Sequence, residues 1–366
     1  MENASISRAL LVAEGSGGHL VPALLVAEAL AKAGADVKLW YAHRAPMAEL
    51  ARALTQDRKG LEIVPMPVEA RGRLVSRLRQ GAALWRQAER CFETFTPEVV
   101  VGFGGWVSAP VLLAASRRRI RCLVHEQNVT LGRANRFLAR RVDRVALSFR
   151  DTHAIPGRTP SLVTGMPVRQ EIGASSRLLA AKRFGLSPER PTVVILGGSQ
   201  GARAINRLMM ETVGHLRADE RTWQFLHLTG SSDVEAIRQA YASAGLAAWV
   251  APFLVDMEDA YAHADLVVAR AGASTIAELA RCGRPAVLIP YPHAHGHQRA
   301  NAALVDAVGG GVVIEESAAT PERLLGALRR LLGDRRLRDM MSGQMRRLDN
   351  PDALERLTEA IAQRRR

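Results

Sequence analysis

The chain alternates short aliphatic runs with longer amphipathic stretches, and this alternation starts twice. Near the beginning, RALLVA at Arg8–Ala13 leads into a glycine-rich turn and then a helical pattern over Leu20–Ala33. In the second half, TVVIL at Thr192–Leu196 leads into another glycine-rich turn and a helical pattern from Arg203. Strands that alternate with helices are typical of a parallel, doubly wound sheet. Two such series, about 180 residues apart, predict two Rossmann-like domains instead of one long sheet.

Further aliphatic runs extend both series of predicted strands. In the first series they are Asp36–Ala42, Leu61–Met66, Glu98–Phe103, Arg121–His125 and Arg144–Leu147. In the second they are Trp223–Leu228, Trp249–Phe253, Leu266–Ala269, Ala286–Ile289 and Val312–Ile314. Proline and glycine interrupt the pattern near Ser161–Gly173. We therefore expect an α/β protein with an N-terminal domain over 1–165, a second domain over 166–345 and a C-terminal helix over 346–366. Whether that helix packs on the first domain or stays exposed is open.

Composition excludes several classes of protein. Of the 366 residues, 48% are hydrophobic and 23% are charged, which is ordinary for a globular chain. No stretch approaches the roughly 20 apolar residues that cross a bilayer, and we see no secretory signal at the start. The three cysteines, Cys91, Cys122 and Cys282, form no CxxC pair. That spacing argues against a zinc site or a disulfide framework and fits a reducing cytosol.

Positive charge is concentrated in the first half of the chain. The formal net charge is +14, and residues 1–150 carry 23 basic against 13 acidic side chains. A basic half predicts an anionic partner, either nucleic acid, a phosphorylated substrate or anionic lipid, although an arginine-rich surface without a partner is the alternative. Aromatic residues are only 5% of the chain and show no RNA-binding cluster, so we expect no nucleic acid.

The first glycine loop places a histidine at a predicted helix start. Gly15 and Gly17 fit the first two positions of a dinucleotide fingerprint, but its third glycine falls on Leu20. His19 follows Gly18 in the first helical turn, where the helix dipole disfavours imidazolium. A neutral ring there can accept a proton. The alternative is that His19 only hydrogen-bonds the helix start.

Two further small-residue loops in the second half suit a nucleotide diphosphate. GGSQGA at 197–202 follows a predicted strand and adds the hydroxyl of Ser199 to glycine amides. RAGAST at 270–275 has the same context, and Glu278 lies one helical turn after Ser274. A carboxylate in that place can accept the hydroxyls of a ribose, and the alternative is a capping or solvent-facing glutamate. No Walker lysine accompanies these loops.

Polar residues also follow two other predicted strands. HEQN at 125–128 comes directly after a buried run, at the sheet edge where ligands bind. His293, His295 and His297 alternate in PYPHAHGHQ, which is not a zinc pattern, so we expect no metal. His297 and Gln298 are better interpreted as ligand-binding residues at a helix start.

A basic stretch at 71–90 has one apolar helical stripe, Leu74, Leu78, Ala82 and Trp85, beside Arg73, Arg77, Arg79 and Arg86. Such a helix can lie on an anionic membrane surface, or its stripe can face the core of the domain.

Seven short segments occur in one order along nearly the whole chain. They are GSGGH (15–19), FGGWVSAP (103–110), HEQN (125–128), TGMPVR (164–169), GGSQGA (197–202), RAGAST with Glu278, and HQRANA (297–302). In this combination the chain resembles the MurG family of bacterial peptidoglycan glycosyltransferases. The resemblance implies a GT-B fold, with two Rossmann-like domains across a ligand cleft. It also implies inverting transfer of N-acetylglucosamine from UDP-N-acetylglucosamine to the 4-hydroxyl of the muramoyl sugar of lipid I, without a cofactor.

The resemblance assigns roles residue by residue. It implies His19 as the catalytic base, with Glu126 as the rival. It implies a donor and cleft set formed by Ser16, Gly17, Gly18, Asn128, Arg169, Ser199, Leu254, Gly272, Ala273, Ser274, Thr275, Glu278, His297 and Gln298. Leu74, Leu78 and Trp85 match the family's membrane-facing patch. The implied location is the cytoplasmic face of the inner membrane, as a peripheral protein of cell-wall synthesis, cell shape and division, with proteins of those processes as candidate partners.

Some positions depart from the family pattern. Glu14 stands where the family has glycine, Ser16 replaces threonine, Trp106 replaces tyrosine, Ala109 replaces glycine and Met166 replaces asparagine. Ser16 keeps a hydroxyl, whereas Trp106 removes one and Glu14 adds a carboxylate near an expected anion site. The alternative functions are another UDP-sugar-dependent GT-B lipid glycosyltransferase, a UDP-N-acetylglucosamine epimerase, or a nucleotide-sugar- or nucleic-acid-binding protein.

Overall fold

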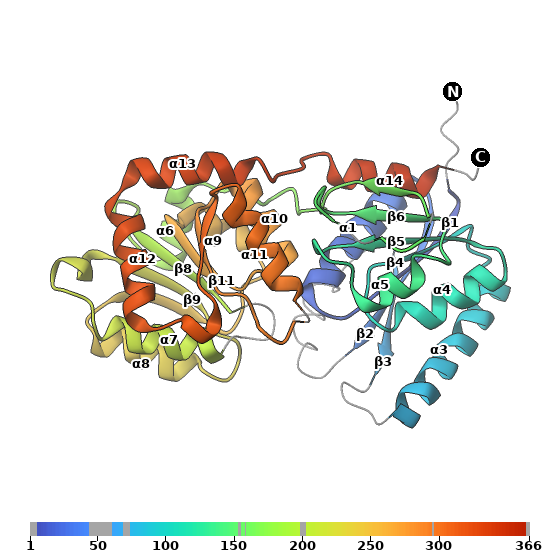
Figure 1. The fold of residues 1–366 in the computed structure, drawn as a ribbon, viewed down its shortest axis with the longest axis horizontal. Helices are drawn as coiled ribbons and strands as arrows, with labels where there is room; N and C mark the ends of the chain where they lie inside the picture. The colour runs from blue at the N-terminus through green and yellow to red at the C-terminus, as the bar shows by residue number, and fades with distance from the viewer. Residues whose placement is uncertain are drawn as a thin grey trace. The chain divides into compact units, whose positions relative to one another are not determined.

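The computed structural model describes residues 6–43, 61–68, 74–152, 155–157, 159–197, 203–294 and 296–363. The chain forms two compact units (Figure 1). Unit 1 comprises Met1–Val168 and Asn350–Arg366, and unit 2 comprises Arg169–Asp349. Each unit is a parallel sheet between helices, so the protein is an α/β chain with two Rossmann-like domains, as predicted.

Unit 1 contains a seven-stranded parallel sheet in the order β3-β2-β1-β4-β5-β6-β7. Its strands are β1 (Arg8–Ala13), β2 (Asp36–His43), β3 (Glu62–Pro67), β4 (Val99–Gly102), β5 (Arg121–Glu126), β6 (Arg144–Leu147) and β7 (Ser161–Val163). Its helices are α1 (Gly17–Lys32), α3 (Leu74–Thr94), α4 (Ser108–Arg117), α5 (Arg133–Leu138) and α14 (Ala353–Ala362).

The alternation of side chains along β1 builds two cores in unit 1. Leu10 and Val12 belong to the core that α3, α4 and α5 cover, whereas Leu11 and its alternate neighbours belong to the core that α1 and α14 cover. Figure 1 shows these helices around the sheet. Leu357 and Ile361 of α14 are fully buried in that second core, beside α1. The last helix of the chain is therefore part of unit 1.

Unit 2 contains a six-stranded parallel sheet in the order β10-β9-β8-β11-β12-β13. Its strands are β8 (Thr192–Leu196), β9 (Gln224–Leu228), β10 (Ala247–Ala251), β11 (Leu266–Ala269), β12 (Ala286–Leu288) and β13 (Gly311–Val313). Its helices are α6 (Arg177–Phe184), α7 (Arg203–Val213), α8 (Val234–Ser243), α9 (Met257–His263), α10 (Ala273–Cys282), α11 (His297–Ala307), α12 (Pro321–Gly333) and α13 (Arg335–Arg346).

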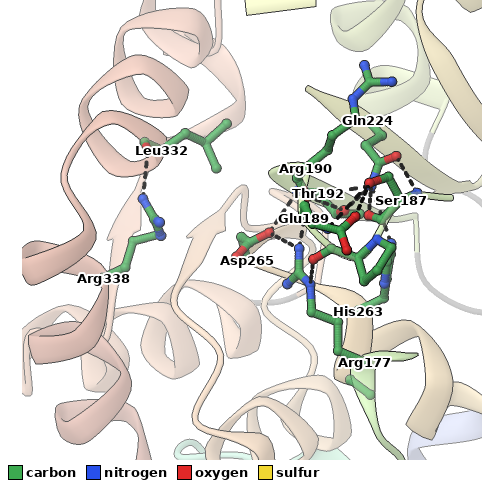
Figure 2. A network of polar contacts seen from close by, with 12 residues as sticks. Arg177, Ser187, Glu189, Arg190, Thr192, Gln224, His263, Asp265, Leu332 and Arg338 are labelled. Carbon is green, nitrogen blue, oxygen red and sulfur yellow. Dashed lines mark hydrogen bonds and ion pairs between the residues drawn. The ribbon is translucent and has the colours of Figure 1, made fainter. Parts of the chain in front are cut away.

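A polar network ties the amino ends of three strands of unit 2 together (Figure 2). Arg177 of α6 donates hydrogen bonds to the carbonyl of Arg190 at 2.9 Å and to Asp265 Oδ2 at 2.8 Å. Asp265 Oδ2 also accepts from the amide of Thr192 at 2.8 Å, and Gln224 Nε2 donates to Thr192 Oγ1 at 2.9 Å. Because ligands of open α/β sheets bind at the carboxyl ends of the strands, this network at the opposite edge holds the fold.

The predicted strands correspond to observed ones, and β1, β6, β8 and β11 have the predicted bounds. One strand differs from the prediction: the sequence predicts an irregular boundary at Ser161–Val163, and the structure has a strand there. It forms β7, the edge strand beside β6. Ser161 and Leu162 are exposed and only three residues pair, so β7 lacks the buried aliphatic run that marks the central strands.

Candidate active site

The strand order of unit 1 creates a switch point between β1 and β4, which are neighbours in the sheet but not in sequence. Ligands of such sheets bind outside the carboxyl ends of the strands at this point. The loop from Glu14 to Ser16 follows β1, and the loop from Phe103 to Gly105 follows β4. The HEQN segment supplies the last two residues of β5 and the first two residues after it, and β5 is the next strand along the sheet. The predicted catalytic and cleft residues of the first half therefore lie at the carboxyl ends of the strands of unit 1.

His19 occupies the first turn of α1, close to the switch point. Ser16 is the N-cap residue, and its hydroxyl lies 2.7 Å from His19 Nδ1 instead of capping a backbone amide. The imidazole packs beside Gly104, where a Cβ atom would lie 2.8 Å from Cδ2 and 3.0 Å from Nε2. Gly104 has a φ of 80°, so both its backbone conformation and the close approach of the ring require glycine. His19 is partly exposed.

Glu126 holds the loop that follows β5. The side chain is buried, and both carboxylate oxygens accept two hydrogen bonds each. Oε1 accepts from the amide and the side chain of Asn128 at 3.0 and 3.1 Å. Oε2 accepts from the amide of Gly132 at 2.8 Å and from Asn135 Nδ2 at 2.9 Å. This arrangement favours a structural role for Glu126 over proton transfer, and it orients Asn128 at the sheet edge.

His125 and Gln127 are core hydrogen-bonding residues. Gln127 Nε2 donates to His125 Nδ1 and to the carbonyl of Phe103, each at 3.2 Å. His125 Nε2 therefore carries the proton and lies 3.2 Å from the carbonyl of Gly165 and from Ser148 Oγ. Burial lowers the pKa of His125 to about 4. A neutral, enclosed imidazole accounts for this histidine without a bound ligand.

Glu14 is accommodated by a second glycine of the loop after β4. Its side chain is buried against Gly105, and a Cβ atom on Gly105 would overlap the carboxylate. Gly105 also has a φ of 80°. The carboxylate of Glu14, which departs from the family pattern, is thus buried against the loop after β4. Trp106 is partly buried against the core under α4.

The switch point of unit 2 lies between β8 and β11. The loop after β8, with Ser199, lies outside the described residues. The loop after β11 leads into α10, where Gly272 is an extended N-cap residue without a side-chain cap. The amide of Ile276 donates to the carbonyl of Gly272 at 3.0 Å. The amides of Ala273, Ser274 and Thr275 precede it and have no acceptor within the helix, and such amides are the groups that bind anions at helix starts.

Glu278 lies one turn further along α10 and is partly exposed. The hydroxyl of the fully buried Tyr261 on α9 donates to Glu278 Oε2 at 2.7 Å. Desolvation raises the pKa of Glu278, while the bond from Tyr261 and the charge of Arg169 act to lower it. Arg169 Nη1 donates to the carbonyl of Val255 at 2.6 Å. Nothing in the sequence near Tyr261 indicates this contact, because a tyrosine between two alanines has the pattern of an ordinary core residue.

The remaining predicted donor residues follow β10 and β12. Leu254 is partly buried in the loop after β10. Gln298 Oε1 accepts from the amide of Tyr291 at 2.9 Å, which fixes this side chain at the start of α11 beside His297. His293 is exposed, and His295 lies outside the described residues. Across the ranges that the structure describes, no group of three histidine, cysteine or acidic side chains is placed to hold a metal ion.

A separate surface of unit 1 presents the apolar stripe of α3. Leu84, Ala88, Cys91 and Phe92 of this helix are buried in the core, and Trp85 packs against it. Leu78 is 65% exposed, Ala82 is exposed and Trp85 is half-buried; the side chain of Leu74 is not described. Leu78 and Ala82 therefore point to solvent, whereas Trp85 lies partly against the core, so the stripe is exposed only in part. No helix in the described part of the chain is both long and apolar enough to span a bilayer.

Comparison with known proteins gives matches over almost the whole chain. The glycosyltransferase family 28 N-terminal domain matches residues 9–147, and the corresponding C-terminal domain matches residues 192–357. The UDP-N-acetylglucosamine–N-acetylmuramyl-(pentapeptide) pyrophosphoryl-undecaprenol N-acetylglucosamine transferase of Desulforamulus reducens is 35% identical, over 97% of this chain and 98% of its own length. The protein of the same name from Syntrophotalea carbinolica is 37% identical, over 95% and 96%. The crystal structure of Acinetobacter baumannii MurG matches with a TM-score of 0.75 at 30% identity, over 97% of this chain and 99% of that one.

Proposed function

Because the chain belongs to the MurG family of N-acetylglucosamine transferases, we propose that it transfers N-acetylglucosamine from UDP-N-acetylglucosamine to the muramoyl 4-hydroxyl of lipid I, forming lipid II. The observation that carries this proposal is the similarity to these transferases over nearly the full length of both chains. The GT-B architecture alone would not be enough, since one fold hosts many reactions.

Unit 2 supplies the donor site in this proposal. The diphosphate binds the amides at the start of α10, with Ser199 and its loop as a second contact, and Glu278 accepts the ribose hydroxyls. Arg169 and the backbone at Leu254 frame the base, and the start of α11 at His297 and Gln298 binds the sugar. Support comes from the uncapped α10 start, whose first turn contains no acidic residue that would repel an anion.

Unit 1 supplies the acceptor site and the base. The 4-hydroxyl oxygen attacks the anomeric carbon as the bond from that carbon to the diphosphate oxygen breaks, and the configuration inverts. His19 takes the hydroxyl proton, and Ser16, Gly17, Gly18 and Asn128 line the site. The four donors already bound to Glu126 favour His19 over Glu126 as the base. Charge that gathers on the departing UDP is stabilised by the α10 amides, which are preorganised before the reaction begins.

The protein docks on the cytoplasmic face of the inner membrane through unit 1. The support is the exposed Leu78 on α3, with the half-buried Trp85 two turns further along and the exposed Arg77, Arg79 and Arg86 nearby. A basic amphipathic helix of this kind inserts its apolar side chains at the headgroup boundary while its arginines bind anionic lipid. Docking there brings the enzyme to an acceptor whose carrier chain lies in the bilayer.

The direct test is sugar transfer by the full chain. Purified protein is incubated with radiolabelled UDP-N-acetylglucosamine and a lipid I analogue with a short carrier chain. We expect one labelled product with the mobility of lipid II, and UDP release that depends on the acceptor. UDP-glucose in place of UDP-N-acetylglucosamine should give little product. Release of UDP without a labelled lipid, or epimerised donor, would contradict the proposal.

A further inference from the structure

The hydroxyl of the buried Tyr261 meets the partly exposed carboxylate of Glu278 in a polar contact that joins α9 and α10. Tyr261 lies on α9 with its ring fully buried, and its hydroxyl donates to Glu278 Oε2 at 2.7 Å. Among the residues that the structure describes, Tyr261 is the only side chain that hydrogen-bonds this carboxylate. A buried tyrosine hydroxyl requires a partner, and this one is directed at the carboxylate that follows the α10 anion site.

The surroundings of Glu278 make the hydrogen bond from Tyr261 important for the protonation of this carboxyl group. Desolvation favours the neutral acid, and the nearby charge of Glu258 acts in the same direction. The Tyr261 bond and the Arg169 charge oppose this effect. Both hydroxyls of a ribose are donors toward such a group, so recognition requires a carboxylate with free acceptor positions and not a protonated acid. A single strong donor on Oε2 also fixes the plane in which Oε1 lies.

We infer that Tyr261 is the positioning residue for ribose recognition: it fixes the Glu278 carboxylate so that its remaining acceptor positions meet the 2′- and 3′-hydroxyls of a bound uridine nucleotide. This inference rests on the proposed function, which places the nucleotide of the donor on α10. It adds a specificity determinant for ribonucleotides that does not itself touch the substrate. Tyr261 acts only through Glu278, so its loss should affect the ribose contact and leave the diphosphate contact intact.

The test compares Tyr261→Phe with the unmodified full chain by isothermal titration against two ligands, UDP and 2′,3′-dideoxyuridine diphosphate. The variant keeps the buried ring and removes only the hydroxyl. Hydrogen bonds to charged groups are worth enough to change affinity about tenfold or more. We expect UDP to bind Tyr261→Phe about tenfold more weakly, and the dideoxy nucleotide to bind both proteins equally. In turnover assays KM for the donor rises by a similar factor, and kcat stays within about twofold.

Tyr241→Phe is the matched control. Tyr241 is another fully buried tyrosine of unit 2, and its hydroxyl lies 3.0 Å from His227 Nδ1. Its loss should leave the affinities for both nucleotides unchanged.

A pH series of UDP binding adds a measurement that a general loosening of the fold would not change. Because the Tyr261 bond lowers the pKa of Glu278, Tyr261→Phe should lose UDP affinity at a higher pH than the unmodified chain, and alkaline buffer should restore part of it.

The outcomes separate the inference from the proposed function. Loss of UDP and dideoxy affinity by the same factor in Tyr261→Phe overturns the inference, since the effect would then be structural. An unmodified chain that binds both nucleotides equally also overturns it, because the ribose would not be recognised, while the transferase proposal stands. An unmodified chain that binds neither nucleotide overturns both.

Discussion

His19 combines a helix-start position with a close glycine neighbour, and these features give a specific kinetic prediction. A positioned general base contributes about a hundredfold to ten-thousandfold in rate. His19→Ala should therefore reduce kcat by at least about a hundredfold, while KM for the donor, bound by unit 2, changes little. Steady-state kinetics with a lipid I analogue measures both constants.

His215→Ala provides the control for removing a histidine. His215 is exposed in unit 2, after α7, and no part of the proposed mechanism uses it. It should keep normal kinetics. Near-normal turnover of His19→Ala would instead assign the proton transfer to another group and would require a new account of the pair formed by Ser16 and His19.

His125 makes the stability of unit 1 depend on pH. Its pKa is about 4 in the folded chain, against 6.5 for an ordinary histidine, because burial disfavours the charged ring. The unfolded chain therefore binds more protons between these two values, so stability falls as the pH drops from about 6.5 toward 4. The shift of about 2.5 pH units corresponds to at most about 3–4 kcal/mol at 1.36 kcal/mol per pH unit.

Urea unfolding followed by tryptophan fluorescence at pH 7.5 and pH 5 measures this loss. His125→Gln removes the titrating group while keeping an amide that can bond in the same place, so its stability should change less between the two pH values. His227, whose pKa burial lowers to about 3, contributes a similar dependence in unit 2 and remains in both proteins. An equal pH dependence in the two proteins would exclude His125 as a source.

At the scale of elements, the loop after β4 shapes the site by leaving space for α1. Gly104→Ala would place a Cβ atom 2.8 Å from the ring of His19, at a φ of 80°. Gly34→Ala has the same backbone cost at a φ of 92°, but no atom lies within 4 Å of its Cβ. Gly34→Ala should lose about 1–2 kcal/mol of unfolding free energy from the backbone alone, and Gly104→Ala should lose more, because the clash with His19 adds to that cost.

The two glycine variants should differ in activity. Displacement of a catalytic group by about 1 Å can cost about a hundredfold in rate, so Gly104→Ala should lose turnover and Gly34→Ala should not. Thermal melts and kcat measured on the same preparations separate the two effects. Equal activity would mean that the ring of His19 shifts without consequence.

Elements with a strong local signal were predicted from the sequence, and those defined by their neighbours were not. β8 and β11 are buried aliphatic runs bounded by turn residues, and their predicted bounds match. β7 forms because its backbone pairs with the edge of β6, and nothing in the sequence of Ser161–Val163 indicates this pairing. Local sequence describes a strand's own burial but not which strand pairs with it.

The same division holds for the candidate site. The uncapped start of α10 and the position of Glu278 follow from helix periodicity and were predictable. The bond from Tyr261 joins two helices and depends on tertiary packing, so no spacing rule could indicate it. The four donors around Glu126 likewise come from a loop conformation, and the sequence left Glu126 as a rival base.

At the scale of the whole molecule, charge and exposed apolar surface coincide in unit 1. Residues 71–150 carry 16 basic and 5 acidic side chains, and this segment includes α3 and α5. Phe137 on α5 is 48% exposed, with the Arg141 guanidinium 4.4 Å from its ring centre. Exposed apolar side chains can insert into the bilayer, and arginines are attracted to anionic lipid headgroups. Both contributions to the binding free energy should therefore be measurable in membrane-binding assays.

Leu78 should carry part of the insertion term. Burying a leucine side chain is worth about 1.5–3 kcal/mol, so Leu78→Glu should weaken binding to phosphatidylglycerol vesicles about tenfold or more in a sedimentation assay. Leu178→Glu is the matched control, because Leu178 is 70% exposed on α6 of unit 2 and should not meet the bilayer. Raising the salt concentration should weaken binding of the unmodified chain through the arginines, since screening acts on charge and not on apolar burial. Equal losses in the two leucine variants would show that unit 1 is not the docking face, and the α3 stripe would then need a different partner.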